Sequence, residues 1–313
     1  MSARRGTDQF GPAERRREPH AGHRSVPARD RVTQRDQSLL LALARTRYLS
    51  TRLIALLLFH GSRRLANRCA RRLRDLGLIR RWVTTQNSDY ICGLTVAGRR
   101  VLETAEDDLP ATIQCPRELD AQFAHELVIN SVRVRLSLAV ERSGGELCWW
   151  RSNRELRAAG RQVTIPDALF AIEWPDGAEQ VYALEVEHRT RALQSFLKKA
   201  ARYAAAAYRP GGIYGERNLV VLVVGADPIW LDRYRAASAR LARPITIGFT
   251  TLADIERAGP TAAVWQTPAG NSLYLRDLGT CTSGRYTSAS ENPDSSSTSA
   301  GDAAHNSDGI HMP

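Results

Sequence analysis

Apolar residues recur at helical spacing in the segments 39–44 and 53–58, which predicts two short helices near the start of the chain. Ser50 precedes the second segment and is its expected N-cap. A third helix is expected to begin at Gly61 and Ser62 and to end near Leu76, because the next residue is Gly77 and glycine favours helix C-termini.

The sequence that follows, LGLIRRWVTTQNSDYICGLT, predicts two short strands around a polar turn at residues 86–89. Thr95 then begins a closing helix, TVAGRRVLETA. Three helices followed by a β-hairpin, with a basic and amphipathic third helix, are typical of a winged helix-turn-helix. We therefore expect residues 34–105 to form an N-terminal winged helix-turn-helix domain.

The pattern changes at Asp120, where DAQFAHELVINSVRVRLSLAVERSG predicts a long helix. Its expected inward-facing residues are Phe123, Leu127, Val134 and Leu138. The strand ELCWWRSNREL follows, and TIPDALFAIEW and QVYALEVEHRT then form a hairpin around WPDGAEQ. The rest alternates helix, strand, helix and strand, so the order α-β-β-β-α-β-α-β predicts an α/β domain with its central strands covered on both faces.

Composition divides the chain into five segments. Residues 1–33 are basic and aperiodic and are expected to be a disordered arm, and the Ser-, Gly- and Asp-rich residues 280–313 are expected to be a disordered tail. Residues 106–119 contain acidic residues and two prolines and form the predicted linker. The predicted folded domains are therefore 34–105 and 120–279.

The net charge of +11 is concentrated in the first third of the chain. Residues 34–105 contain fourteen arginines against four acidic residues, whereas the 208 residues after them contain 22 basic and 25 acidic groups. This asymmetry is typical of a nucleic-acid-binding module joined to a nearly neutral one. A solvated basic face, or a coding bias toward arginine, is the alternative, although a bias does not explain why the excess is confined to one segment.

Several classes of protein do not fit the composition. No apolar stretch is long enough to span a membrane, and the first thirty residues lack the apolar core of a secretory signal. The five cysteines are scattered and form no C-x-x-C pair, so neither a disulfide framework nor a structural zinc site is indicated. We expect a cytoplasmic protein.

The predicted third helix contains the residues expected to bind DNA. Its apolar stripe is Leu65, Cys69, Leu73 and Leu76. The candidate DNA-binding residues on this helix and at the start of the hairpin are Arg63, Arg64, Asn67, Arg68, Arg71, Arg72, Arg74, Arg80 and Arg81. Arginine and asparagine can make paired hydrogen bonds to guanine and adenine edges, and flanking arginines can bind phosphates. The face expected to meet the bases consists of Arg63, Asn67, Arg71 and Arg74. An exposed helix face, or a winged helix used for dimerisation, remains the alternative.

Three acidic residues mark a candidate site in the second domain. Asp167 follows Pro166 at the start of one strand, and Glu185 and Glu187 lie two apart on the next, so strand alternation directs both to the same side. Clustered carboxylates are costly unless a cation neutralises them, and Mg²⁺ or Mn²⁺ would suit Asp167 and Glu185 as ligands. A metal held in this way could activate water to attack a phosphodiester.

The order Pro-Asp, hairpin, Glu-x-Glu resembles the PD-(D/E)xK nuclease fold, as in restriction endonucleases. Glu187 occupies the position where that motif has lysine, and the chain's two lysines, Lys198 and Lys199, lie on the following helix. The resemblance implies that one of these lysines supports the transition state. The alternative is a surface network in which the glutamates pair with Arg189, Arg191 or Arg202.

The chain also resembles the replication-relaxation family of plasmids and integrative elements over 36–265. The residues that carry this resemblance are YICGLTVAGRRVL, HELVINSVRVRL, the run IPDALF, YALEVEHRT and LKKAARYAAAAY, and FTTLADIERAGPTAAVW. It implies a winged helix joined to a nuclease-like α/β domain that acts on mobile DNA. His125, Asn130 and Arg133 on the long helix are expected to border the acidic site, although a lone histidine is more often a satisfied core residue.

Three functions remain open. The favoured hypothesis is a DNA-binding accessory protein that acts in replication or transfer of a plasmid or mobile element. The alternatives are a metal-dependent endonuclease that uses Asp167 and Glu185, and a transcriptional regulator of the element. Double-stranded DNA is the expected partner, with replication or relaxation proteins of the same element and a second copy of the chain as further candidates.

Overall fold

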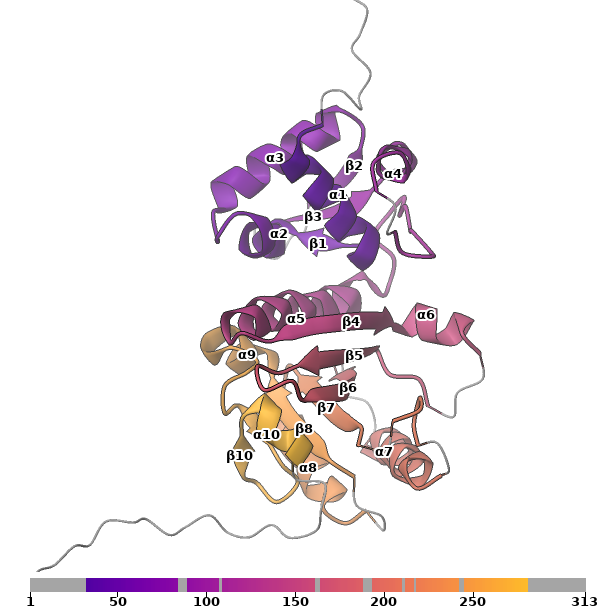
Figure 1. Ribbon diagram of the computed structural model, residues 1–313, viewed down its shortest axis with the longest axis vertical. Coiled ribbons are helices and arrows are strands. Elements are labelled where there is room, and N and C mark those ends of the chain that lie inside the picture. The colour runs from indigo at the N-terminus through magenta and orange to yellow at the C-terminus, as the bar shows by residue number, and fades with distance from the viewer. Residues whose placement is uncertain are drawn as a thin grey trace, which may run out of the picture.

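The computed structural model describes residues 32–83, 89–106, 109–160, 164–187, 193–209, 212–216, 218–241 and 245–280. The predicted arm and tail lie outside these ranges except for residues 32, 33 and 280, as does most of the predicted turn at 86–89. The chain has a mixed α/β structure in which an N-terminal unit (32–106) lies on a larger α/β unit (109–280), as Figure 1 shows.

The N-terminal unit contains four helices and a small sheet. Its elements are α1 (Gln34–Thr46), β1 (Leu49–Ser50), α2 (Thr51–Leu58), α3 (Arg63–Asp75), β2 (Ile79–Val83), β3 (Tyr90–Leu94) and α4 (Val96–Glu103). The side chains of Ser50, Ser62 and Thr95 accept backbone hydrogen bonds at the N-termini of α2, α3 and α4. The predicted helix starts are thus confirmed, and β1 is an unpredicted strand that pairs with β3 in the sheet order β1-β3-β2.

The core of the N-terminal unit corrects the predicted apolar stripe of α3. The fully buried residues of this helix are Ala66, Ala70 and Leu73, whereas Leu65 and Cys69 are only partly buried. Small alanine side chains allow the helix to approach its neighbours closely, so burial follows the alanines rather than the larger apolar residues.

The predicted linker is packed against this same core. Leu109 and Ile113 are partly buried against it, and the carbonyl oxygen of Pro116 accepts a hydrogen bond of 2.9 Å from Arg80. The segment is therefore part of the contact surface between the two units.

The α/β unit is built on a seven-stranded sheet with the order β10-β9-β8-β7-β6-β5-β4. The strands are β4 (Glu146–Ser152), β5 (Ala168–Glu173), β6 (Glu179–Glu187), β7 (Val220–Gly225), β8 (Ile247–Thr251), β9 (Trp265–Gln266) and β10 (Ser272–Leu273). Strands β6, β7 and β8 are parallel, and the remaining pairings are antiparallel.

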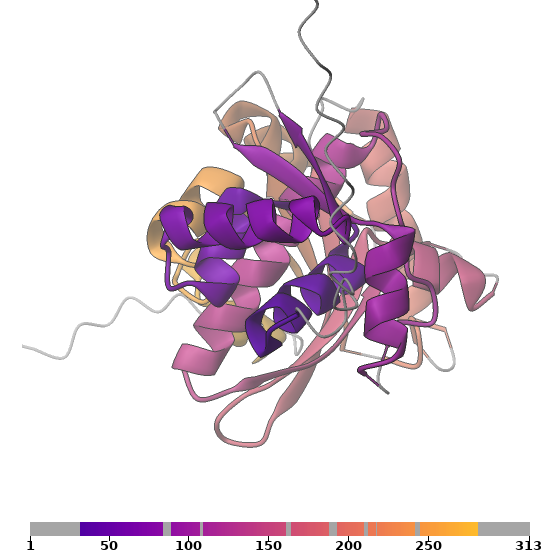
Figure 2. The ribbon, with the colours of Figure 1, turned by 90° about the horizontal axis from the view of Figure 1, so that it is seen from above.

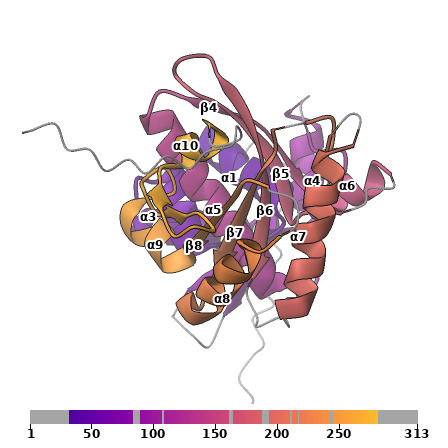
Figure 3. The ribbon, with the colours of Figure 1, turned by 90° about the horizontal axis from the view of Figure 1, so that it is seen from below.

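Helices cover both faces of this sheet, as predicted. One face packs against α5 (Phe123–Arg142), α9 (Leu252–Ala258) and α10 (Leu275–Thr280), and the other packs against α7 (Leu193–Ala207) and α8 (Pro228–Ser238), as Figure 3 shows. Residue Ser152 caps the short helix α6 (Asn153–Ala158), which replaces the end of the first predicted strand. Within the described residues, no helix has the length and apolar character needed to cross a membrane.

Helix α5 packs on two sides. Val132, Leu136 and Val140 belong to the core between this helix and the sheet, whereas Val134 belongs to the core of the N-terminal unit. Phe123 and Leu127, predicted to face inward, are only half-buried near the N-terminus of the helix. Apolar residues on several sides of one helix indicate burial between two layers, and α5 lies between the two units in Figure 1.

Candidate functional site

Three arginines of α3 share one exposed face of the helix. Arg64, Arg68 and Arg71 have the spacing i, i+4 and i+7, and they lie opposite the buried alanines of the helix. Within the described residues, none of the three makes a hydrogen bond or an ion pair. Figures 1 and 2 show α3 on the side of the N-terminal unit that faces away from the α/β unit, so the α/β unit does not cover this helix.

Residues of the hairpin contact two other candidate DNA-binding residues of α3, Asn67 and Arg63. Asn67 accepts a hydrogen bond of 3.1 Å from Arg81, whose guanidinium lies 3.9 Å from the centre of the Tyr90 ring. Arg63 lies 3.6 Å from Asp89, beside the hairpin. These contacts fix the hairpin against the side of α3, so Arg63 and Asn67 lie beside the hairpin rather than on the face that contains Arg64, Arg68 and Arg71.

The remaining candidates also have partners within the protein. Arg72 pairs with the buried carboxylate of Asp36 on α1, and Arg74 lies 2.6 Å from Asp75. The face expected to contact the bases consists of Arg63, Asn67, Arg71 and Arg74. It therefore overlaps only in part with the face of Arg64, Arg68 and Arg71, which makes no hydrogen bond or ion pair among the described residues. Arg71 is the residue common to both.

Asp167 lies at the point where the chain enters β5, and both of its carboxylate oxygens have partners. One oxygen accepts a hydrogen bond of 2.8 Å from the backbone N–H of Val186, and the other lies 3.2 Å from Nε2 of His125 on α5. The hydrogen bond and charge of His125 hold the pKa of Asp167 below its ordinary value, against the opposing effect of burial. The imidazole therefore helps to compensate the carboxylate.

Glu185 is buried on β6 and paired with a lysine from α7. Its carboxylate pairs with Lys199 and accepts a hydrogen bond of 2.5 Å from the hydroxyl of Tyr203. Burial raises the pKa of Glu185 to about 7, with Lys199 opposing this shift and the charge of Asp167 adding to it. Strand, hairpin and helix thus bring Asp167, Glu185 and Lys199 together.

The other predicted catalytic residues are placed differently. Glu187 is buried further along β6, whereas Lys198 is exposed, and Lys199 is the lysine that contacts Glu185. Arg189 and Arg191 lie outside the described residues, and Arg202 is exposed. Among the described residues, no group of three or more His, Cys, Asp or Glu side chains is arranged to hold a metal ion.

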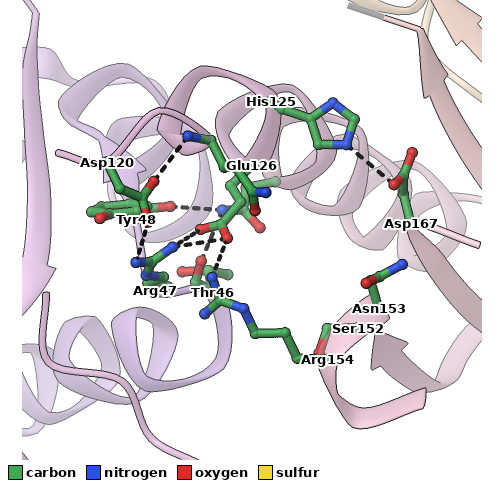
Figure 4. A network of polar contacts seen from close by, with 12 residues as sticks. Thr46, Arg47, Tyr48, Asp120, His125, Glu126, Ser152, Asn153, Arg154 and Asp167 are labelled. Atoms are coloured by element: carbon green, nitrogen blue, oxygen red, sulfur yellow. Dashed lines mark hydrogen bonds and ion pairs between the residues drawn. The ribbon is translucent and has the colours of Figure 1, made fainter. Parts of the chain in front are cut away.

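A polar network joins the two units next to this site, as Figure 4 shows. Arg47, just after α1, donates to Asp120 at 2.5 Å and to Glu126 at 3.0 and 3.1 Å, and Arg154 of α6 donates to Glu126 at 2.8 Å. The buried amide of Asn130 donates to the carbonyl oxygens of residues 46 and 48, at 2.9 and 2.8 Å. The end of α1 is therefore held by side chains from the α/β unit.

A cavity of about 610 Å³ lies between the units, bordered by the end of α1, α5, α6 and the acidic site. Its lining includes His125, Asn130 and Arg133, which confirms that these residues border the same site as Asp167 and Glu187. Arg133 donates to the carbonyl oxygen of Arg45 at 3.1 Å, and its guanidinium lies 5.2 Å from the centre of a Trp150 ring.

A family model described as replication-relaxation matches residues 40–221, which include α3, the acidic site and all the lining residues of the cavity. The chain belongs to the replication-relaxation family. No curated protein and no solved structure matches the chain.

In this replication-relaxation protein, sequence reasoning missed the network between the units. Arg47, Glu126 and Arg154 are ordinary charged residues in their segments, and no motif distinguishes them. One signal was present in α5, where Asn130 and Ser131 interrupt a helix with apolar residues on several sides. A buried asparagine needs hydrogen-bond partners, so it indicates a contact with another element.

Proposed function

We propose that this replication-relaxation protein is a DNA-binding accessory factor whose N-terminal unit is a winged helix. In this proposal α3 lies in the major groove of duplex DNA, and β2 and β3 form the wing beside it. The family suggests a role in replication or transfer of a plasmid or mobile element. The α/β unit contacts DNA or partner proteins without cutting the strand.

The observation that carries this proposal is the exposed face of Arg64, Arg68 and Arg71. These three exposed cations have no ion-pair partner among the described residues, so their guanidinium groups remain available to an external anion. Duplex DNA supplies a regular array of phosphates and, in the major groove, guanine acceptors that match guanidinium groups.

The order of the elements also supports this proposal. Three helices, a hairpin and a closing helix follow one another, and Ser62 caps the helix that would read the groove. The N-terminus of α3 carries a partial positive charge from the helix dipole, which adds to the attraction for phosphate. Arg81 and Asn67 hold the hairpin beside α3, so the proposed wing and recognition helix would reach DNA as one rigid surface.

Fluorescence anisotropy with labelled duplex fragments of the parent element tests this function. We expect replacement of Arg64, Arg68 and Arg71 by glutamine to abolish specific binding and to reduce the slope of log affinity against log salt by about 0.9 for each phosphate that is no longer neutralised. Arg142→Gln, at the exposed end of α5, is the matched control. Equal binding by the triple variant and the control would refute the proposal.

Footprinting on the same element separates the favoured role from regulation of transcription. Protection over a replication or transfer origin is the expected result. Protection confined to a promoter would instead assign the protein to transcriptional control of the element.

A second candidate function, metal-dependent DNA cleavage, is supported by the meeting of Asp167, Glu185 and Lys199. An aspartate at a strand entry, a glutamate on the paired strand and a lysine would correspond to the PD-(D/E)xK arrangement with its lysine on α7. The contacts of the two carboxylates favour the non-cleaving role, because His125 and Lys199 already pair with them.

Nicking of supercoiled plasmid DNA with Mg²⁺ or Mn²⁺ distinguishes the two functions. The accessory function predicts no nicking by the wild-type protein under conditions in which it binds the same plasmid. Nicking that Asp167→Ala and Glu185→Ala both abolish would establish the endonuclease and place its metal at these two carboxylates.

A further inference from the structure

One basic side chain in the lining of the cavity, that of Arg133, has no carboxylate partner among the described residues. Arg133 lines the cavity and donates to a backbone carbonyl, but among the described residues no acidic side chain forms an ion pair with it. Its burial, and next the charge of nearby Arg45, lower its pKa to about 10. A guanidinium in such surroundings gains from an anion that enters the cavity.

Among the described residues, no acidic side chain of the cavity forms an ion pair with Arg133, and the charge of Glu155 only partly opposes the lowering of its pKa. Glu126 is held by Arg47 and Arg154, and Asp167 is held by His125. Glu155 accepts hydrogen bonds of 2.7 Å from both the backbone N–H and the hydroxyl of Ser152, as part of the capping box of α6. Each of these three carboxylates already has its own donors, and Glu187, the fourth in the lining, also has an interaction within the protein.

The size and the lining of the cavity define the class of ligand. A volume of about 610 Å³ falls in the range of small-molecule sites, about 300–1,000 Å³, and exceeds the needs of a single small ion. Such sites are common where two units meet. Elsewhere in the lining, Thr112, Gln114 and Gln122 supply further donors and acceptors for a sugar or base.

We propose that this cavity binds a 5′-phosphate monoester, carried by a free nucleotide or by the end of a DNA strand, with Arg133 as the anchoring cation. The planar guanidinium can donate two parallel hydrogen bonds to a phosphate, a geometry that lysine does not offer. This site is separate from the exposed face of α3 and does not depend on duplex binding by that face.

Isothermal titration calorimetry on the full chain tests the site with two matched pairs of probes. The first pair is deoxythymidine monophosphate and thymidine, and the second is a short oligothymidylate with a 5′-phosphate and the same oligonucleotide with a 5′-hydroxyl. We expect the phosphorylated member of at least one pair to bind about tenfold or more tightly than its partner. A preference in the first pair alone identifies free nucleotide as the ligand, and a preference in the second alone identifies a strand end.

Three variants test whether the preference for the phosphorylated probe arises at this cavity. Arg133→Gln should abolish it, whereas Arg142→Gln at the exposed end of the same helix should keep it. Because Arg133→Gln also disturbs the contact with α1, Ala158→Trp provides an independent test, since it narrows the cavity and keeps every charge. No preference for phosphate in either pair, or a preference that survives in Arg133→Gln or in Ala158→Trp, overturns the proposal.

Discussion

The exposed arginines of α3 and the lysine of α7 show two opposite ways in which this chain uses positive charge. Arg64, Arg68 and Arg71 lie on an exposed face without protein partners among the described residues, whereas Lys199 is paired with buried Glu185. A solvated cation remains available to an external anion, but a cation that compensates a buried carboxylate is required by the fold. Positive charge therefore remains exposed to solvent in one unit and compensates a buried carboxylate in the other.

The largest expected effect is on stability, at Lys199. Lys199→Met leaves Glu185 buried and uncompensated, and we expect it to lower the free energy of unfolding by about 3–5 kcal/mol at pH 8. The neighbouring exposed lysine supplies the control, and Lys198→Met should change the unfolding free energy by no more than about 0.5 kcal/mol. Urea denaturation of both variants measures the difference. If both lose similarly little free energy of unfolding, Lys199 is not required by the fold and does not differ in this way from the arginines of α3.

The pH dependence of stability should show the cost of burying Glu185. The pKa of this carboxyl rises from its ordinary value of 4.5 to about 7 in the folded protein, so the folded state binds the proton more tightly. Its stabilising contribution is therefore complete below about pH 4.5 and is lost as the pH rises through about 7, by about 3 kcal/mol in all.

The substitution Glu185→Gln should remove this decline, and Glu179→Gln at the exposed start of β6 should leave it unchanged. Urea denaturation midpoints across this pH interval provide the measurement. A decline of the same size in both variants would show that other groups cause it.

An intermediate effect is expected at the contact between the units. Arg47→Ala removes the hydrogen bonds to Asp120 and Glu126, and because Arg47 is largely buried we expect a loss of about 2 kcal/mol in unfolding free energy. The exposed pair of Arg52 and Glu256, at 3.6 Å, is the comparison, and Arg52→Ala should cost less than about 1 kcal/mol. Thermal unfolding measures both, and equal losses would indicate that burial of the pair is unimportant.

The smallest expected effect on stability is at α3. Arg68→Ala should change the unfolding free energy by no more than about 0.5 kcal/mol while it weakens DNA binding, because the side chain contacts solvent and no described acidic residue. Circular dichroism on heating, run beside the anisotropy titration, measures the two properties in one preparation. A marked loss of stability would show that this arginine, like Lys199, supports the fold.

The sequence predicted the local structure well because local signals determine it. Ser50, Ser62 and Thr95 are N-caps in the structure, and the Pro-Asp-Gly turn does join β5 to β6. Alternation along β6 also placed Glu185 and Glu187 on one side, close enough to α7 for Lys199 to reach the first of them. These features depend on residues close together in the chain.

Features that depend on distant contacts could not be predicted in the same way. The exposed face of α3 differs from the expected one because the hairpin contacts Asn67, and this contact is known only once the hairpin is placed. The pairing of Arg47 with Glu126 joins residues 79 positions apart, and residue type alone does not select that pair from the many arginines and glutamates. The unpredicted strands β9 and β10 are two residues long, below the length at which alternation is visible.

The double packing of α5 limits how freely its sequence can vary. A substitution at Val134 must suit the core of the N-terminal unit, and one at Leu136 must suit the core between α5 and the sheet. Asn130 must in addition keep its hydrogen bonds to the carbonyl oxygens at the end of α1. Little of this helix is left to change without cost, in contrast to α3, where most side chains face solvent. Sequence variation on the exposed side of the molecule is therefore open to α3, while α5 remains the constrained element on which both units rely.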